Sequence, residues 1–157
     1  MAGLLQVDFL LPSVDYSTFL RVTRLMTGDQ RQVEAAFRRC VFNILFNSRD
    51  DHAKNFSYRM SRDWHWQLSP CNDLSFNPGP GGEHQMSVMG ESRAPGLADL
   101  LRLAADTGVP ERHARGVVEA MVAQTGLWTN LAHGAPIRTA TIKAIGRAIE
   151  ANRKRLK

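Results

Sequence analysis

Apolar residues recur at three- and four-residue steps along most of the chain, which is the spacing of amphipathic α-helices. Gly28 follows the first of these stretches as a plausible stop, and Asp29 offers an N-cap for the second. Pro136 stands at the start of the last one. Cys40 falls among the apolar positions of the second stretch, so we expect a buried free thiol. The pattern predicts helices over residues 14–26, 30–47, 97–107, 111–131 and 137–156.

Two shorter segments have a different period, because apolar and polar residues alternate along them. Residues 56–60 and 64–68 alternate on either side of a polar tripeptide, which predicts a β-hairpin. Trp64 and Trp66 stand two positions apart, so we expect both to pack on one side of this hairpin. The other non-helical predictions are a short strand, a mobile turn-rich loop and an extended lead-in, over residues 85–89, 77–82 and 1–13. The predicted fold class is therefore α+β and mostly helical.

Composition and charge narrow the class of protein. The 157 residues are 43% apolar and 22% charged, which is ordinary for a soluble globular protein, so we expect a single domain over residues 1–157. The net charge of +5 suits anionic partners, but much of the excess lies in the C-terminal tail, where we expect a solvated helix face. The sequence has no recognisable helix-turn-helix and no interleaving of basic and aromatic residues, so we do not expect direct nucleic-acid binding.

The sequence also indicates a compartment. It has no apolar run of about 18 residues, so no transmembrane helix is expected. The first residues lack the basic start of a signal peptide. Cys40 and Cys71 do not form a C-x-x-C pair, and free thiols fit a reducing environment. We therefore expect a cytoplasmic protein without membrane contact.

A polar segment joins the second helix to the hairpin and holds the residues with the most chemistry, Asn47-Ser48-Arg49-Asp50-Asp51-His52-Ala53-Lys54-Asn55. Phosphoryl transfer needs a carboxylate that accepts or orients the proton of the attacking hydroxyl, and Mg²⁺ with hard oxygen ligands. Protein kinases place a catalytic Asp and a metal-binding Asn in the pattern D-x-x-x-x-N, and a second metal-binding Asp beyond a hairpin. Asp50, Asn55 and Asp73 have that order and that intervening structure.

Each of these residues could also have a purely structural role. Asp50 and Asp51 fit a loop pair after a helix with no chemical role, and Asn55 and Asp73 fit simple turn residues. Whichever holds, we expect Asp51 to be a solvated neighbour or a salt-bridge partner. The remaining histidines are too scattered for a metal-ligand set, at His84, His113 and His133.

The polar segment and its surroundings resemble a known family. The run from Asn47 to Ser57 is similar to the N-x-D-[DG]-H-x-K-N-x-S signature of HipA-type serine/threonine kinases. Residues 66–74 resemble the family's W-x-L-[ST]-P-x-Y-D-L stretch, with Asn72 where the family usually has an aromatic residue. Residues 42–46 and 85–90 resemble the segments before and after. The resemblance covers roughly residues 15–150.

The resemblance implies a kinase-like C-terminal lobe with a β-hairpin after the catalytic loop. Asp50 would be the catalytic base or hydroxyl-orienting residue, and Asn55 and Asp73 would hold Mg²⁺ against the phosphates of ATP. Lys54 would offset phosphate charge, and His52 would order the loop by hydrogen bonding. The residues implied to line the nucleotide site are His52, Ala53, Lys54, Asn55, Asn72, Asp73, Leu74 and Ser75.

The resemblance also implies partners and a second lobe. Family members act in the bacterial cytoplasm in toxin–antitoxin systems, with a DNA-binding antitoxin and a protein substrate. Their N-terminal lobe supplies a glycine-rich loop and a lysine for the phosphates, and neither pattern precedes Asp50 here. We therefore expect a catalytic lobe that is incomplete alone, as a fragment, part of a split kinase that needs a separate N-terminal lobe, or a decayed gene product. The alternative is a non-catalytic module that binds an antitoxin or another protein.

Overall fold

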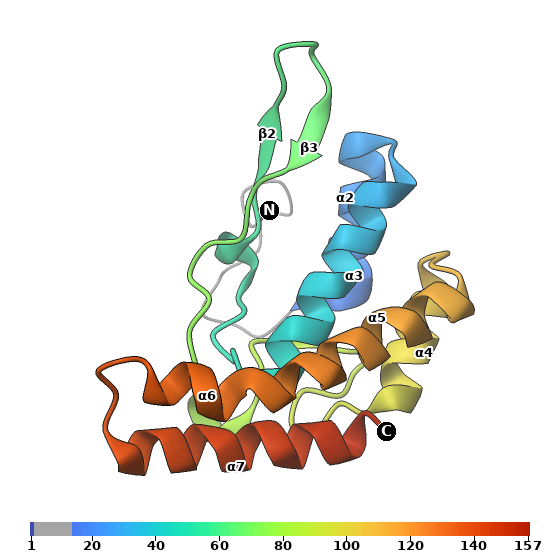
Figure 1. Cartoon of the computed structure of the whole chain (residues 1–157). Coiled ribbons are helices and arrows are strands. Elements are labelled where there is room, and N and C mark those ends of the chain that lie inside the picture. The colour runs from blue at the N-terminus through green and yellow to red at the C-terminus, as the bar shows by residue number, and fades with distance from the viewer. Residues whose placement is uncertain (2–13) are drawn as a thin grey trace.

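Two antiparallel helices at the N-terminal end form the centre of the fold (Figure 1). The computed structural model of the chain describes Met1 and residues 14–157, so the expected lead-in lies almost entirely outside the described residues. Helix α2 spans Tyr16–Thr27 and helix α3 spans Gln30–Leu45. Gly28 closes α2 at a φ of 61°, and the Asp29 carboxylate accepts the backbone N–H of Arg31 at 2.9 Å. Both predicted helix boundaries are thus confirmed.

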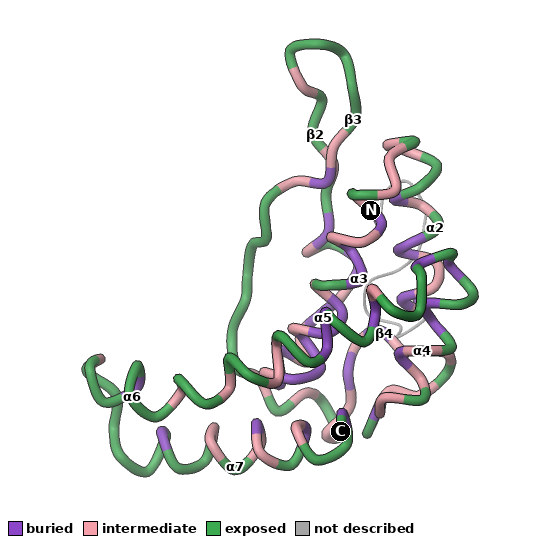
Figure 2. The backbone as a smooth tube through the Cα atoms, turned by 45° about the vertical axis from the view of Figure 1, so that its right-hand side comes forward, coloured by how far each residue is buried: buried purple, intermediate pink, exposed green. Residues whose placement is uncertain are grey.

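The apolar faces of α2 and α3 meet in the core of the protein. Phe19, Leu20 and Phe37 are fully buried there. Figure 2 shows that buried positions gather on α2, α3 and α4, while the hairpin and the lower helices are mostly exposed. Cys40 is a buried free thiol, as predicted, and burial raises its pKa well above the usual range of a thiol.

The hairpin projects from this core (Figure 1). Strands β2 (Tyr58–Met60) and β3 (Trp66–Leu68) pair antiparallel with Tyr58 opposite Leu68, so the predicted hairpin is confirmed with shorter strands. The packing predicted for the two tryptophans is wrong, because Trp64 lies in the turn at a φ of 61°. The side chains of Trp64 and Trp66 are 81% and 40% exposed.

A second, very small sheet brings a distant segment to the start of α2. Strand β1 (Val14–Asp15) pairs in parallel with β4 (Met86–Ser87), which lies within the predicted strand 85–89. Asp15 accepts hydrogen bonds from Ser87 Oγ at 2.7 Å and from Gly90 N at 3.0 Å. This pairing holds residues 84–90 beside the start of α2 and against the polar segment, where Gln85 N donates to the carbonyl of Arg49 at 3.2 Å.

The C-terminal half is helical, as predicted. Its helices are α4 (Leu97–Asp106), α5 (Glu111–Gln124), α6 (Trp128–His133) and α7 (Thr139–Arg155). The single helix predicted over 111–131 is wrong, because a 3₁₀ turn over Thr125–Leu127 separates α5 from α6. Gly126 lies in this turn, and glycine is a weak helix former. The described residues contain no helix long and apolar enough to cross a membrane.

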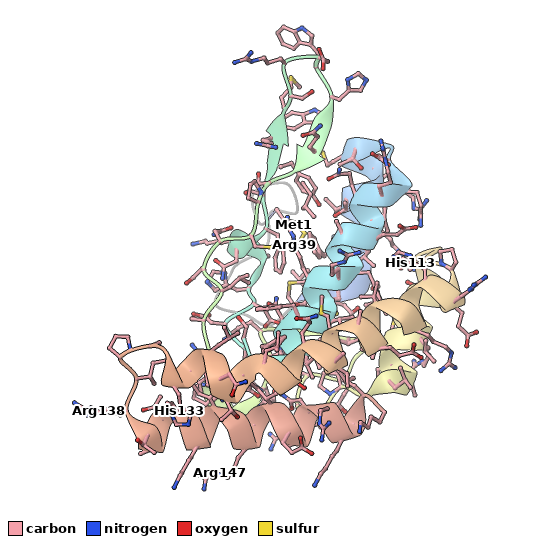
Figure 3. All side chains as sticks on the ribbon, in the orientation of Figure 1. Met1, Arg39, His113, His133, Arg138 and Arg147 are labelled. Atoms are coloured by element: carbon pink, nitrogen blue, oxygen red, sulfur yellow. The ribbon has the colours of Figure 1, made fainter. Side chains whose placement is uncertain are left out.

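Helix α7 lies along the lower edge of the molecule and carries much of the basic charge. Arg138, just before α7, and Arg147, within it, point away from the body of the protein (Figure 3). The predicted solvated face is therefore confirmed. One polar residue of α7 faces inward instead: Asn152 is 3% exposed and donates to the carbonyl of Ile44 at the end of α3, at 2.8 Å.

Candidate functional site

The polar segment and the stretch after the hairpin form the two sides of a narrow crevice beside α3. Asp50, Asn55 and Asp73 all line it, although Asp73 is separated from Asn55 by the whole hairpin. The crevice has an internal volume of about 10 Å³, which is room for about one water molecule. A larger ligand would therefore lie across its mouth. The full lining is Arg39, Asn43, Ser48, Asp50, Asp51, Asn55, Phe56, Cys71, Asn72, Asp73 and Leu74.

The polar segment has a defined conformation that begins where α3 ends. Asn47 adopts a φ of 57°, a left-handed conformation that asparagine tolerates better than most residues. The backbone N–H of Ser48 then donates to the carbonyl of Asn43 at 2.9 Å. A 3₁₀ turn over Ala53–Asn55 follows. The segment is thus a well-packed loop. We call residues 48–55 the catalytic loop, after the role that the family resemblance implies for them.

Asn55 closes the catalytic loop on itself. Its Nδ2 donates to the backbone carbonyl of Asp50 at 2.8 Å, so the orientation of the amide is set by a partner that only accepts. Asn55 Oδ1 receives no hydrogen bond from the described residues. The atom left for a ligand is therefore an oxygen, which is the kind of atom that Mg²⁺ prefers.

Asp50 has the exposure that a catalytic carboxylate needs. Its side chain is 44% exposed, so its oxygens are open to a ligand at the mouth of the crevice. The imidazole of His52 lies nearby, with its Nε2 3.8 Å from Asp50 Oδ1. This distance is too long for a hydrogen bond. The predicted role of His52 in ordering the loop by hydrogen bonding stays a prediction.

Asp51 differs sharply from its neighbour. The expectation of a solvated side chain is wrong, because Asp51 is 2% exposed. The expectation of a salt-bridge partner fits better, since Asp51 Oδ2 lies 2.8 Å from Nδ1 of the buried His84. Tyr16 also donates its hydroxyl to Oδ2 at 2.7 Å. Sequence reasoning missed this pairing because Tyr16 and His84 are each more than thirty residues away from Asp51.

Asp73 lies on the opposite wall of the crevice. It adopts a φ of 53°, in the left-handed region where aspartate is more common than most residues. Residues 70–76 are exposed throughout, so the side of Asp73 away from the loop faces solvent. Arg39 of α3 donates to the carbonyl of Ser69 and so holds the start of this stretch against the helix. Asn72, the departure from the family pattern, is exposed as well.

The crevice includes some of the residues implied to bind a nucleotide and leaves out others. Those that line it are Asn55, Asn72, Asp73 and Leu74. Those that do not are His52, Ala53, Lys54 and Ser75. Ala53 is buried in the core, whereas Lys54 and Ser75 are exposed nearby. The nucleotide role of all eight residues stays a prediction.

Sequence reasoning missed two residues of α3 that line the crevice, Arg39 and Asn43. They stand four positions apart, so they lie on one face of the helix. Asn43 is 3% exposed within an otherwise apolar run, and a buried amide among apolar residues is the signal that could have marked it. Its Nδ2 donates to the Tyr16 hydroxyl at 2.8 Å, and its buried Oδ1 has no hydrogen-bond partner among the described residues.

The donor atoms of the crevice suit a hard cation better than a transition metal. The described residues contain no group of three or more His, Cys, Asp or Glu side chains placed to hold a metal ion. The crevice instead offers the carboxylates of Asp50 and Asp73 and the amide oxygen of Asn55, while the third carboxylate, of Asp51, is taken up by hydrogen bonds. Carboxylate and amide oxygens are the ligands that Mg²⁺ prefers, and its remaining water or phosphate ligands would lie at the mouth of the crevice.

Comparison with known proteins identifies the family. No curated protein sequence matches the chain. The structure is similar to HipA of the toxin–antitoxin system of Shewanella oneidensis MR-1, solved in complex with HipB and operator DNA, with a TM-score of 0.73 at 15% sequence identity. The match covers 91% of this chain and 36% of that HipA chain. The profile of the HipA-like C-terminal domain matches residues 1–128. The chain therefore belongs to the family of HipA-like C-terminal domains.

Proposed function

We propose that the chain is the catalytic lobe of an ATP- and Mg²⁺-dependent serine/threonine protein kinase of toxin–antitoxin type. One observation carries the proposal: the fold brings Asp50, Asn55 and Asp73 to one crevice from two segments separated by the hairpin. Their side chains supply the oxygen atoms that a phosphoryl-transfer site needs. Membership of the HipA-like family supports the same reading.

The roles of the three residues follow from their surroundings. Asp50, with its exposed carboxylate, accepts the proton of the attacking hydroxyl or orients it. Asn55 Oδ1 and the carboxylate of Asp73 hold Mg²⁺. The Asn55–Asp50 hydrogen bond keeps the base and one metal ligand at a constant separation. When bound, Mg²⁺–ATP supplies the phosphoryl group and a positive charge beside it.

The proposal includes a second lobe and protein partners. The chain spans 36% of the length of the HipA structure it matches, so the activity of a whole protein is a proposal here. The exposure of residues 70–76 fits a site that another lobe covers, from the same polypeptide or from a separate one. The partners proposed are a DNA-binding antitoxin and a protein substrate, in a bacterial cytoplasm. The S. oneidensis HipA is itself in a complex with HipB and operator DNA.

The second candidate is a non-catalytic module that binds an antitoxin or another protein. The helical C-terminal half favours it, because apolar side chains are exposed there. Leu127 is 50% exposed and Leu131 on the short helix α6 is 69% exposed. Exposed apolar residues that lie close together mark contact surfaces. In this case the crevice would bind no metal–nucleotide.

Binding of Mn²⁺ in the presence of ATP separates the two candidates. Mn²⁺ replaces Mg²⁺ at oxygen sites and is counted directly by electron paramagnetic resonance. We expect saturable binding by the wild-type chain, and a loss of at least about tenfold in affinity for Asp73→Asn and for Asn55→Ala. Asp106→Asn is the control, because this carboxylate is exposed on α4 and pairs with Arg21. Equal binding by all four proteins would exclude the crevice as the metal site.

A further inference from the structure

The buried carboxylate next to the proposed base has no role in the chemistry described so far. We propose that Asp51 is a positioning residue, which holds the catalytic loop by its own carboxylate so that Asp50 faces the mouth of the crevice. The role given to Asp50 rests on the proposed function, whereas the anchoring of the loop by Asp51 does not depend on it. It also divides the roles within the Asp50-Asp51 pair, which the sequence leaves open.

The hydrogen bonds of Asp51 show why it cannot act as the base or as a metal ligand. Oδ2 accepts from Tyr16 Oη at 2.7 Å and lies 2.8 Å from His84 Nδ1. Oδ1 accepts from the backbone N–H of Gln85 at 2.9 Å and of Met86 at 3.4 Å. A carboxylate has about four acceptor positions, so all are used. Asp50, by contrast, remains exposed.

The donors come from elements on both sides of the loop in sequence. Tyr16 is the first residue of α2, and residues 84–86 lead into β4, which pairs with β1. The parallel pair β1–β4 holds these two elements together, and Asp51 ties the catalytic loop to both. The loop is therefore anchored to α2 and to the segment before β4 at the residue adjacent to Asp50.

The direction of each hydrogen bond is settled by chemistry. Burial and the nearby charge of Asp51 raise the pKa of Tyr16 well above its usual range, so its hydroxyl stays protonated and donates. The same oxygen accepts from Asn43 Nδ2 at 2.8 Å. His84 faces a carboxylate through Nδ1, which assigns the proton to that nitrogen. A buried carboxylate needs hydrogen-bond donors, so the removal of one donor should displace the Asp51 carboxylate.

Amide hydrogen exchange in the catalytic loop tests the anchor without reference to catalysis. Tyr16→Phe removes one donor but keeps the ring that packs edge-on against Phe19 and Phe56. We expect exchange of the loop amides to quicken by about tenfold, while amides of α5 keep their rates. The matched control is Tyr58→Phe, which removes a hydroxyl hydrogen-bonded to Thr23 at 2.8 Å and should change loop exchange by less than about twofold.

A pair of substitutions at His84 tests the donor itself. An Asn side chain places Nδ2 about where His places Nδ1, so His84→Asn keeps the donor, whereas His84→Leu keeps bulk without it. We expect loop exchange near the wild-type rate in His84→Asn and about tenfold faster in His84→Leu. The same rate in both variants, or equal effects of Tyr16→Phe and Tyr58→Phe, overturns the proposal, because packing alone would then hold the loop.

Phosphoryl-transfer kinetics separate positioning from simple structural support. We expect Tyr16→Phe to lower kcat by about tenfold with KM for ATP changed by less than about twofold, since the base is displaced while Asp73, which lies outside the loop, still holds the metal. A rise in KM with unchanged kcat contradicts this role. If the wild-type protein transfers no phosphate even with the partner lobe present, the proposed function fails, while the exchange measurements still decide whether Asp51 anchors the loop.

Discussion

The link between the C-terminal helix α7 and the end of α3 leads to a quantitative prediction about stability. Asn152 of α7 is 3% exposed, and its Nδ2 donates to the carbonyls of Ile44 at 2.8 Å and of Leu45 at 3.3 Å. These are among the last carbonyls of α3, which have no partner within the helix. Asn152→Ala removes this donor from both carbonyls, and Ile44 O keeps backbone donors such as Asn47 N at 3.4 Å.

The cost follows from the burial of those carbonyls. A buried acceptor left without a hydrogen bond costs about 1–3 kcal/mol, and one to two acceptors are affected, so we expect a loss of about 2–4 kcal/mol. Urea unfolding at 25 °C measures it as a lower midpoint at an unchanged slope. Asn130→Ala on the exposed side of α6 is the control, with an expected change within about 0.5 kcal/mol. A loss at Asn152 no larger than that of the control refutes the reasoning.

Two further predictions concern the effect of pH and the backbone of the loop before β4. Burial raises the folded-state pKa values of Cys40 and Tyr16, so their contribution to stability is complete below the unfolded-state pKa values and is lost as the pH rises. We therefore expect the free energy of unfolding, measured with urea across this range, to fall above about pH 8.5 and more steeply above about pH 10. The fall that begins near pH 8.5 should be absent in Cys40→Ala. Gly79 has a φ of 75°, and a Cβ added there would collide with the Glu83 carbonyl, whereas Gly81 has a φ of 61° and open space around it. In thermal unfolding, Gly79→Ala should therefore cost about 2 kcal/mol more stability than Gly81→Ala. Equal costs would contradict the predicted collision.

Local sequence signals were sufficient for most of the secondary structure. Helix α3 has an N-cap, an apolar stripe and a clear end, and its observed span of Gln30–Leu45 is close to the prediction. The hairpin follows from alternation of apolar and polar residues. The predictions that failed depended on tertiary context. The break at Thr125–Leu127 interrupts a continuous apolar pattern, and Trp64 is exposed because no element covers the hairpin turn.

The candidate site could be predicted only in part for a similar reason. Asp50, Asn55 and Asp73 were found because their order and spacing form a motif. The surroundings of Asp51 could not be found in this way, because its donors come from Tyr16 and from residues 84–86, which a two-residue parallel pairing brings together. A pairing of that length has no sequence signature. Helical periodicity likewise showed that α3 is buried, but not which of its polar residues face the crevice.

The most direct test of the central claim is the rate of phosphate transfer from Mg²⁺–ATP to a protein serine, in the presence of the partner lobe if one is required. We expect Asp50→Asn to lower this rate by about 10²–10⁴-fold while Mn²⁺–ATP binding is retained, because the base is lost and the metal ligands remain. The matched substitution Asp63→Asn, at an exposed carboxylate of the hairpin turn outside the crevice, should have a much smaller effect. A rate for Asp50→Asn equal to that of the wild-type protein would contradict the account.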